Sequence, residues 1–246
     1  VHLYECGFTG LSDGPADVLG TILGDHFDPE TAVEKLGVKF RIQQNYFKFH
    51  ACCRFNHPAL DAVIALQNRE SFDADQIRDI EVVTIDCPEG MVGDYPKNML
   101  SAKFSIPYAV AAAVIRGTTN LSTFSPEAIG DSQIRNLTEK VRVVLDPQMS
   151  LQREDQPTAK VSILMKDGRR FSEATNIVRG EAANPVPHQE LVSKFHSLTR
   201  ETLGTQQALA AVETVDHLED VSTVAKLTAI LSPSSSVNEP DAKEEP

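Results

Sequence analysis

The segment Pro107–Ile115, PYAVAAAVI, places the strongest constraint on the fold, because it is apolar on almost every side when wound as a helix. Pro107 suits the first turn of that helix, and Gly117 lies where a helix commonly ends. A helix without a polar face has to be buried by other elements. The chain must therefore surround this helix with a core, and its 246 residues are enough to form a sizeable one.

Patterns typical of both helices and strands occur on either side of this segment. A helix is predicted over 57–69, where Asn56 suits the N-cap, Pro58 fits the first turn, and apolar residues recur three and four positions apart. Short runs rich in β-branched residues predict strands instead. These strands are 80–85, 141–145, and a hairpin of 159–165 and 169–175 that turns at Lys166-Asp167-Gly168.

The two ends of the chain favour helices. Short helices are predicted at 15–23 and 29–36, the second with Asp28 as its N-cap, and longer helical patterns run over 188–203 and 206–231. The last stretch, SPSSSVNEPDAKEEP, has no apolar periodicity and is predicted to be a disordered tail.

Helices therefore precede and follow a middle that mixes strands with helices, which predicts the α+β fold class. We expect an α+β domain at 46–186 between helical segments at 1–45 and 187–231, followed by a tail at 232–246. The two helical segments hold little core of their own. They are expected to pack against something that this sequence does not contain.

Composition and charge narrow the functional classes. The net charge of −12 argues against nucleic acid as a partner, because a phosphate backbone attracts a basic surface. No apolar run approaches the roughly 20 residues of a membrane span, and residues 1–10 do not resemble a signal peptide. The four cysteines lack disulfide or zinc-site spacing and are interpreted as reduced thiols. No G-x-G-x-x-G, Walker A or H-E-x-x-H motif is present, so we expect neither a nucleotide site nor a metal site. We expect a cytoplasmic location, or a mitochondrial one in a eukaryote.

The stretch KFHACCRFNH gathers basic side chains directly before a predicted helix. Lys48, His50, Arg54 and His57 lie close in sequence, near the free N–H groups of a helix start, which favour an anion. Arginine can hold a carboxylate with two hydrogen bonds, and lysine or histidine can transfer protons. The alternative is that Lys48 and Arg54 are solvated surface charges and that His57 only begins the helix.

A second candidate, KFSIPY, lies at the start of the apolar helix. Lys103 adds a cation, and the Tyr108 hydroxyl can donate to a carboxylate or act as a general acid. The alternative is a core tyrosine whose hydroxyl bonds to the backbone. Ser105 is expected to be an N-cap, since no G-x-S-x-G elbow surrounds it. Cys52 and Cys53, beside a basic residue, allow either a lowered thiol pKa or a buried structural role.

Four segments together resemble the MmgE/PrpD family, in the family's order. KFHACCRFNHPALDAVIAL is similar to its K-x-Y/H-x-C-C-R-x-T/N-H-x-x-[LI]-D-A segment, and AKFSIPYAVAAAVIRG to its A-K-F-S-[LI]-P-Y-A-V-A-A-A segment. GFTGLSDGPADVLG resembles a G-F-T-G-P stretch, and GEAANPVPHQELVSKF resembles a G-x-P-x-N-P passage that ends in E-L-x-x-K-F. The resemblance covers roughly residues 5–200.

The resemblance implies a cofactor-independent lyase or isomerase that acts on a small di- or tricarboxylate, such as 2-methylcitrate dehydratase, cis-aconitate decarboxylase or iminodisuccinate epimerase. It implies a large helical domain with an α+β lid, an active site between the two, and a homodimer. Lys48 and Tyr108 match active-site positions of the family. Arg54, His57, His50 and Lys103 are expected to bind the substrate, although His50 departs from the commoner pattern.

No segment here resembles the N-terminal half of the family, which holds the Asp and His residues that complete proton transfer. We therefore expect this chain to be the C-terminal half and to be inactive alone, with an N-terminal-half partner required for turnover. The alternative is a non-catalytic interaction module or one half of a split enzyme.

Overall fold

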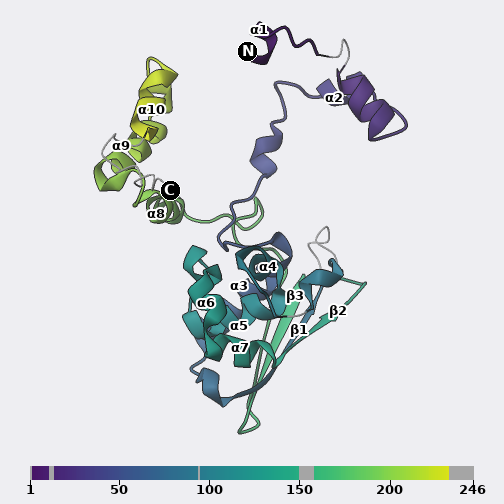
Figure 1. Cartoon of the computed structure of the whole chain (residues 1–246), viewed down its shortest axis with the longest axis vertical. Coiled ribbons are helices and arrows are strands. Elements are labelled where there is room, and N and C mark those ends of the chain that lie inside the picture. Colours follow the sequence, from purple (N-terminus) through teal and green to yellow (C-terminus); the bar gives the residue numbers. More distant parts are fainter. Residues whose placement is uncertain (1, 11–13, 94, 150–157, 233–246) are drawn as a thin grey trace, which may run out of the picture. The chain divides into compact units, whose positions relative to one another are not determined.

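The computed structural model describes residues 2–10, 14–93, 95–149 and 158–232. The chain divides into two compact units, 1–45 and 46–246 (Figure 1). The tail predicted at 232–246 lies outside the described residues from position 233 onward.

The first unit consists of short helices without a core. They are α1 (His2–Glu5), a π-helix (Ala16–Ile22), α2 (Pro29–Val33) and a 3₁₀ helix (Arg41–Gln44). As predicted, Asp28 caps α2, since its carboxylate accepts from the N–H of Glu30 at 3.0 Å. The predicted helix over 29–36 is too long, because α2 ends at Val33 and Lys35 adopts a positive φ of 60°. None of the described side chains of this unit is buried.

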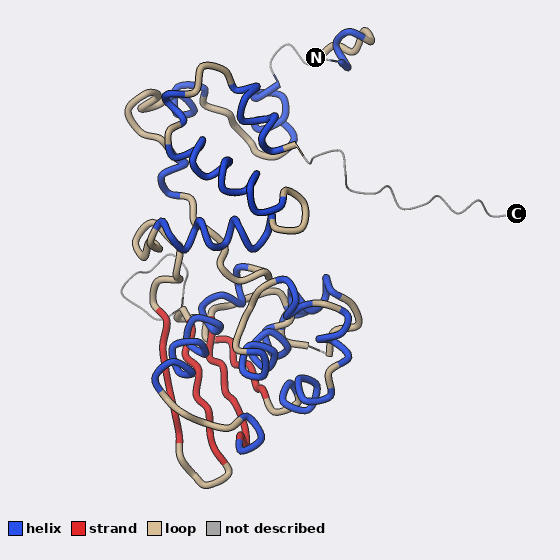
Figure 2. The backbone as a smooth tube through the Cα atoms, turned by 90° about the vertical axis from the view of Figure 1, so that its left-hand side faces the viewer, coloured by secondary structure: helices blue, strands red, loops and turns tan. Residues whose placement is uncertain are grey.

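The second unit is built on a four-stranded mixed sheet, which Figure 2 shows as strands lying side by side. The strand order is β2 (Val141–Leu145), β1 (Ile77–Thr84), β3 (Ala159–Met165) and β4 (Arg170–Thr175). β1 pairs in parallel with β2, whereas β3 is antiparallel to both β1 and β4. The predicted β3–β4 hairpin is confirmed, and Gly168 supplies the positive φ of 90° that its turn requires.

Two helices, α3 (His57–Arg69) and α5 (Ile106–Arg116), cover the sheet. α3 packs on β3 and β4, α5 packs on β2, and the two helices pack against each other. Every residue of α5 from Ile106 to Val114 is buried, which confirms that this apolar helix forms the centre of the core. The α+β fold class is therefore correct.

Both ends of α5 are capped as the sequence predicts, whereas the start of α3 is not. The Ser105 hydroxyl accepts from the N–H of Tyr108 at 3.2 Å, and Gly117 ends the helix with a φ of 64°. Asn56 makes no capping bond, so that prediction is wrong. Its amide donates instead to the carbonyl of Lys103 at 2.9 Å, because the two segments are brought together in the tertiary structure.

In the described part of the second unit, three short α-helices were not predicted: α4 (Met99–Phe104), α6 (Pro126–Gly130) and α7 (Ser132–Thr138). Each has a side-chain cap, from Asn98, Ser125 and Asp131 respectively. Helices of one or two turns contain too few residues for apolar periodicity to be recognised. Their capping residues were therefore the only local signal.

The last described segment contains α8 (His188–Thr199), α9 (Gly204–Asp216) and α10 (Val224–Leu231). The predicted helix over 206–231 is interrupted at 217–223 by a 3₁₀ turn. Only Ala208 and Ala211 are buried among the described residues of these helices. No helix in the described ranges is long and apolar enough to cross a bilayer.

Candidate functional site

The residues that precede α3 form a loop held by backbone hydrogen bonds to three distant segments. We call residues 46–56 the lysine loop, because Lys48 lies within it. The N–H of Phe47 donates to the carbonyl of Gly180 at 3.0 Å, and the N–H of Ala51 donates to that of Thr119 at 2.9 Å. The N–H of Cys53 donates to the carbonyl of Lys103 at 2.9 Å. The conformation of the loop is thus set by its surroundings.

His50 is the main side-chain anchor of this loop. Its Nδ1 lies 2.6 Å from the Thr119 hydroxyl and its Nε2 lies 2.9 Å from an Asp61 carboxylate oxygen. The other Asp61 oxygen accepts from the N–H of Arg179 at 2.8 Å. Only 4% of His50 is exposed. With both ring nitrogens occupied, His50 is placed to hold the loop rather than to bind a substrate through its ring nitrogens.

His57 packs against His50 and is fully buried. Its Nε2 is 3.2 Å from the carbonyl of Cys52, its Nδ1 has no partner among the described residues, and the two imidazoles meet edge to face at 4.9 Å. Burial lowers the pKa of His57 to about 3, with a smaller contribution from His50. His57 is therefore neutral at physiological pH.

The charge of Arg54 is already compensated within the protein. Its guanidinium forms an ion pair with Glu181 and lies 5.0 Å from the ring centroid of Tyr46. Burial raises the pKa of Tyr46 to about 12, so its hydroxyl stays protonated. Arg54 does not line the cleft that Lys48 lines.

Lys48 lines a cleft of about 730 Å³. Lys103 and Lys194 reach the same cleft from α4 and α8, so three lysines from three parts of the chain converge there. No carboxylate among the described residues forms an ion pair with any of the three. In a chain with a net charge of −12, this is a local concentration of uncompensated positive charge.

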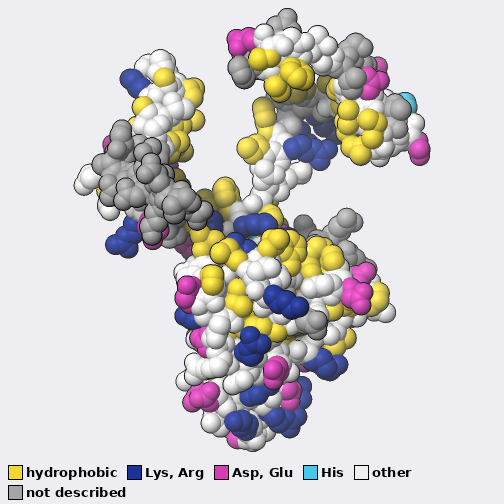
Figure 3. Space-filling view, viewed as in Figure 1, with side chains coloured by type: hydrophobic (Ala, Val, Ile, Leu, Met, Phe, Trp, Pro, Cys, Tyr) yellow, Lys and Arg dark blue, Asp and Glu magenta, His cyan; other side chains and the backbone are white. Residues whose placement is uncertain are grey.

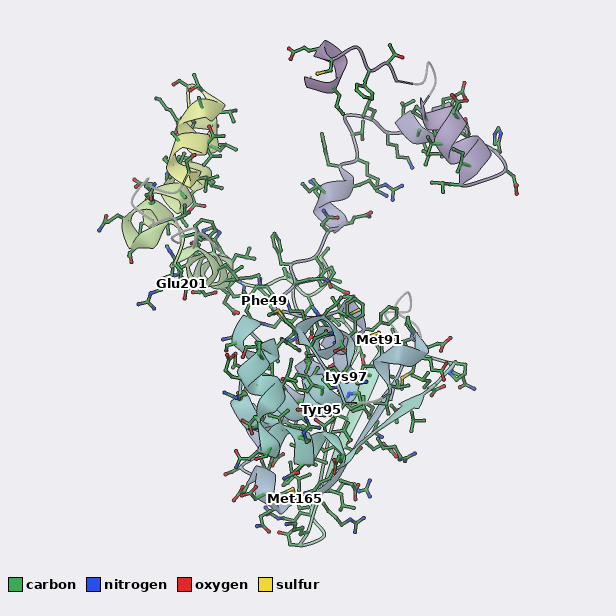
Figure 4. All side chains as sticks on the ribbon, viewed as in Figure 1. Phe49, Met91, Tyr95, Lys97, Met165 and Glu201 are labelled. Atoms are coloured by element: carbon green, nitrogen blue, oxygen red, sulfur yellow. The ribbon has the colours of Figure 1, made fainter. Side chains whose placement is uncertain are left out.

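Tyr108, which the family resemblance assigned to the active site together with Lys48, does not line this cleft. The ring packs between Tyr95 (labelled in Figure 4) and Phe124, with centroids 5.8 Å and 6.2 Å away. Its hydroxyl donates to the carbonyl of Thr123 at 2.9 Å, and the residue is fully buried. Burial also raises the pKa of Tyr108. These contacts are those of a core tyrosine.

The two adjacent cysteines of the loop differ in burial. Cys52 is buried, and burial raises the pKa of its thiol to about 12. This excludes the lowered thiol pKa that its basic neighbour suggested. Cys53 is partly exposed and lines the cleft beside Lys48.

The structure therefore brings together Lys48, Lys103 and His50, and leaves Arg54, His57 and Tyr108 outside the cleft lining. Sequence reasoning missed Lys194, which lies far along the chain from the other two lysines. It also missed Asp61 and Thr119, which hold His50. A pairing between residues so far apart has no local signature in one sequence.

Comparisons with known proteins identify the domain. A family model described as the MmgE/PrpD C-terminal domain matches residues 50–220. The chain is 25% identical to mouse cis-aconitate decarboxylase over 71% of this chain and 37% of the relative. It is 22% identical to the cis-aconitate decarboxylase-like protein oryM of Aspergillus oryzae over 84% of this chain and 44% of that relative. The human cis-aconitate decarboxylase matches at 24% identity over 56% of this chain and 28% of its own length.

The chain spans less than half the length of the curated relatives that it matches. The matched range contains the sheet, both core helices and most of the lysine loop. Because this family model matches more than half of the chain, the chain belongs to the MmgE/PrpD family and contains its C-terminal domain.

Proposed function

We propose that this chain binds a small polycarboxylate in the cleft of Lys48 and Lys103, as part of an MmgE/PrpD-type lyase. The observation that supports this most directly is the set of cleft lysines without carboxylate partners. Each free ammonium can donate charge-assisted hydrogen bonds to a carboxylate, which are stronger than neutral ones. A cleft of about 730 Å³ is within the usual size range for a small-molecule site.

Lys48 and Lys103 suit the chemistry of such a reaction. Removing a proton, or carbon dioxide, next to a carboxylate builds negative charge on the substrate. Fixed cations that point at this charge lower the barrier, and removing one such donor costs roughly 10²–10³ in rate. His50 contributes indirectly to the positioning of Lys48, because its hydrogen bonds to Thr119 and Asp61 hold the segment that carries Lys48.

Decarboxylation of an unsaturated tricarboxylate is the reaction favoured by the names of the relatives. Dehydration of a 2-methylcitrate-like acid and epimerisation are alternatives that the family resemblance leaves open. We propose a homodimer in a reducing compartment, the cytoplasm or mitochondria, with no cofactor. Turnover is proposed to need a second polypeptide region that matches the rest of the relatives, so that this chain alone is inactive.

The test has two stages. Calorimetric titration with cis-aconitate compares the chain with Lys48→Met and with Lys166→Met, an exposed lysine in the β3–β4 turn. We expect Lys48→Met to weaken binding at least tenfold and Lys166→Met to leave it unchanged. The chain is then mixed with the N-terminal part of a relative and assayed for decarboxylation, dehydration and epimerisation. A chain that binds no carboxylate and restores no activity would contradict the proposal.

An interaction module, or one half of a split enzyme, is the second candidate function. The observation that favours it is the apolar surface of residues 1–45, visible as hydrophobic side chains in Figure 3. Ile22, Leu36, Val38 and Ile42 are each more than 70% exposed. Side chains of this kind commonly mark a protein contact. Sedimentation of the chain with and without the N-terminal part of a relative tests this, and the absence of a complex would argue against it.

A further inference from the structure

The third lysine of the cleft, Lys194, lies on α8, far along the chain from the lysine loop and from α4. α8 contributes Glu190, Ser193, Lys194 and Ser197 to the cleft lining. These positions are three and four residues apart, so they share one face of the helix. A polar face of α8 is thus part of the cleft wall.

The acidic residue on this face does not neutralise Lys194. Glu190 lies four residues earlier, which is the usual spacing for a helical ion pair. Glu190 pairs instead with Arg179, which leaves Lys194 without a carboxylate partner in the described part of the chain. The Lys194 ammonium lies 5.9 Å from the ring centroid of Phe49, and the Arg179 guanidinium lies 4.7 Å from it (Phe49 is labelled in Figure 4).

The serines on the same face have their hydroxyl hydrogens committed within α8. The Ser193 hydroxyl donates to the carbonyl of Gln189 at 2.8 Å, and the Ser197 hydroxyl donates to that of Lys194 at 2.7 Å. Lys194 is therefore the cationic donor that this face offers to an anion in the cleft.

Three uncompensated ammonium groups in one cleft repel one another, and a monocarboxylate neutralises only one of them. A ligand with two or three carboxylates neutralises more of this charge. Resting on the proposed function, we propose that Lys194 binds a carboxylate remote from the one held by Lys48 and Lys103. In this arrangement Lys194 makes the cleft selective for polycarboxylates over monocarboxylates.

The experiment measures binding directly and does not require turnover. The full chain is titrated with propane-1,2,3-tricarboxylate and with butanoate, which are unreactive probes. The variants are Lys194→Met, Lys194→Arg, Lys48→Met, and Lys226→Met as an exposed lysine of α10 that does not line the cleft. Circular dichroism confirms that each variant is folded.

We expect Lys194→Met to weaken tricarboxylate binding about tenfold or more, as loss of one charge-assisted contact would. The affinity for butanoate should change less than twofold, so the ratio of the tricarboxylate affinity to the butanoate affinity falls. Lys194→Arg should keep most of the affinity, and Lys226→Met should change neither probe.

Two results would overturn the inference. One is Lys194→Met with unchanged tricarboxylate binding while Lys48→Met still lowers it, which would leave the proposed function intact. The other is an equal loss for both probes, which would indicate a general electrostatic effect. Absence of tricarboxylate binding to the unaltered chain would reject both this inference and the proposed function.

Discussion

At the scale of single residues, Tyr108 illustrates how burial limits the chemistry of a motif residue. Its position at the start of the apolar helix suits both an active-site acid and a core tyrosine. The bond from its hydroxyl to the carbonyl of Thr123 and its complete burial favour the second role. The two roles differ in a measurable way, because loss of a structural hydroxyl lowers the stability of the fold, whereas loss of an active-site hydroxyl weakens the interaction with the substrate.

Tyr108→Phe is expected to lower the free energy of unfolding by about 1–2 kcal/mol, because the buried carbonyl of Thr123 loses its partner. Tricarboxylate binding should stay within twofold of the unaltered chain. Chemical denaturation and calorimetric titration measure the two quantities. Unchanged stability together with lost binding would instead place the hydroxyl at the substrate.

His57 predicts a pH dependence of stability. Its pKa falls from an ordinary 6.5 to about 3 in the folded chain, so protonation favours the unfolded state. The contribution of neutral His57 to the free energy of unfolding is fully present above pH 6.5 and is lost as the pH falls toward 3. Between these two pH values, the slope of the free energy of unfolding against pH that is due to His57 approaches about 1.4 kcal/mol per pH unit.

The window from pH 6.5 to 5 lies above the ordinary pKa values of Asp and Glu side chains, so it separates the effect of His57 from that of the carboxylates. Over that window, denaturant unfolding of the unaltered chain is compared with His57→Gln. The variant should show a shallower loss of stability. Equal slopes in the two proteins would assign the pH dependence to other groups.

At the scale of elements, the lysine loop depends on its contact with the segment between β4 and α8. The N–H of Phe47 donates to the carbonyl of Gly180, and Gly180 has a φ of 95°. A Cβ at this position would collide with the carbonyl oxygen of Phe47. Gly180 is therefore required both by its backbone conformation and by the close approach of the loop.

Gly180→Ala is expected to destabilise the chain by about 1–3 kcal/mol and to weaken carboxylate binding, because the loop that carries Lys48 must shift. Gly130→Ala serves as the matched control, since a Cβ there meets nothing within 4 Å and its φ is not positive. Thermal unfolding and titration are measured for both. If Gly180→Ala behaves like the control, the contact does not hold the loop.

At the scale of the whole molecule, the two units differ in how far they can fold alone. The sheet, α3 and α5 form a buried core, whereas none of the described side chains in residues 1–45 is buried. A segment without a core gains little stability from its own packing. Residues 1–45 are therefore expected to become stable through contact with another polypeptide.

Deletion of residues 1–45 should leave the thermal midpoint of the remaining chain unchanged, since its core is complete. The deletion should also reduce binding of the dye ANS and aggregation, because exposed apolar side chains are removed. Differential scanning calorimetry and ANS fluorescence check these outcomes. A truncated chain that fails to fold would show that the first unit belongs to the core.

Much of the fold was predictable from local patterns. The apolar helix with Ser105 and Gly117 at its ends, the α3 helix, and the strands of the hairpin all have signals within a few residues. The short helices α4, α6 and α7 lacked periodicity and were missed. The family was also predictable, because its motifs are contiguous segments.

The sequence by itself thus determined the two core helices, the strands of the sheet, the fold class and the basic character of the lysine loop. Only the tertiary structure decided which basic groups are free. Arg54 is paired with Glu181, His50 is held by Thr119 and Asp61, and Lys194 joins Lys48 and Lys103 in one cleft. The physical reason is that secondary structure follows from neighbours along the chain, whereas burial and charge compensation depend on residues that meet only after folding.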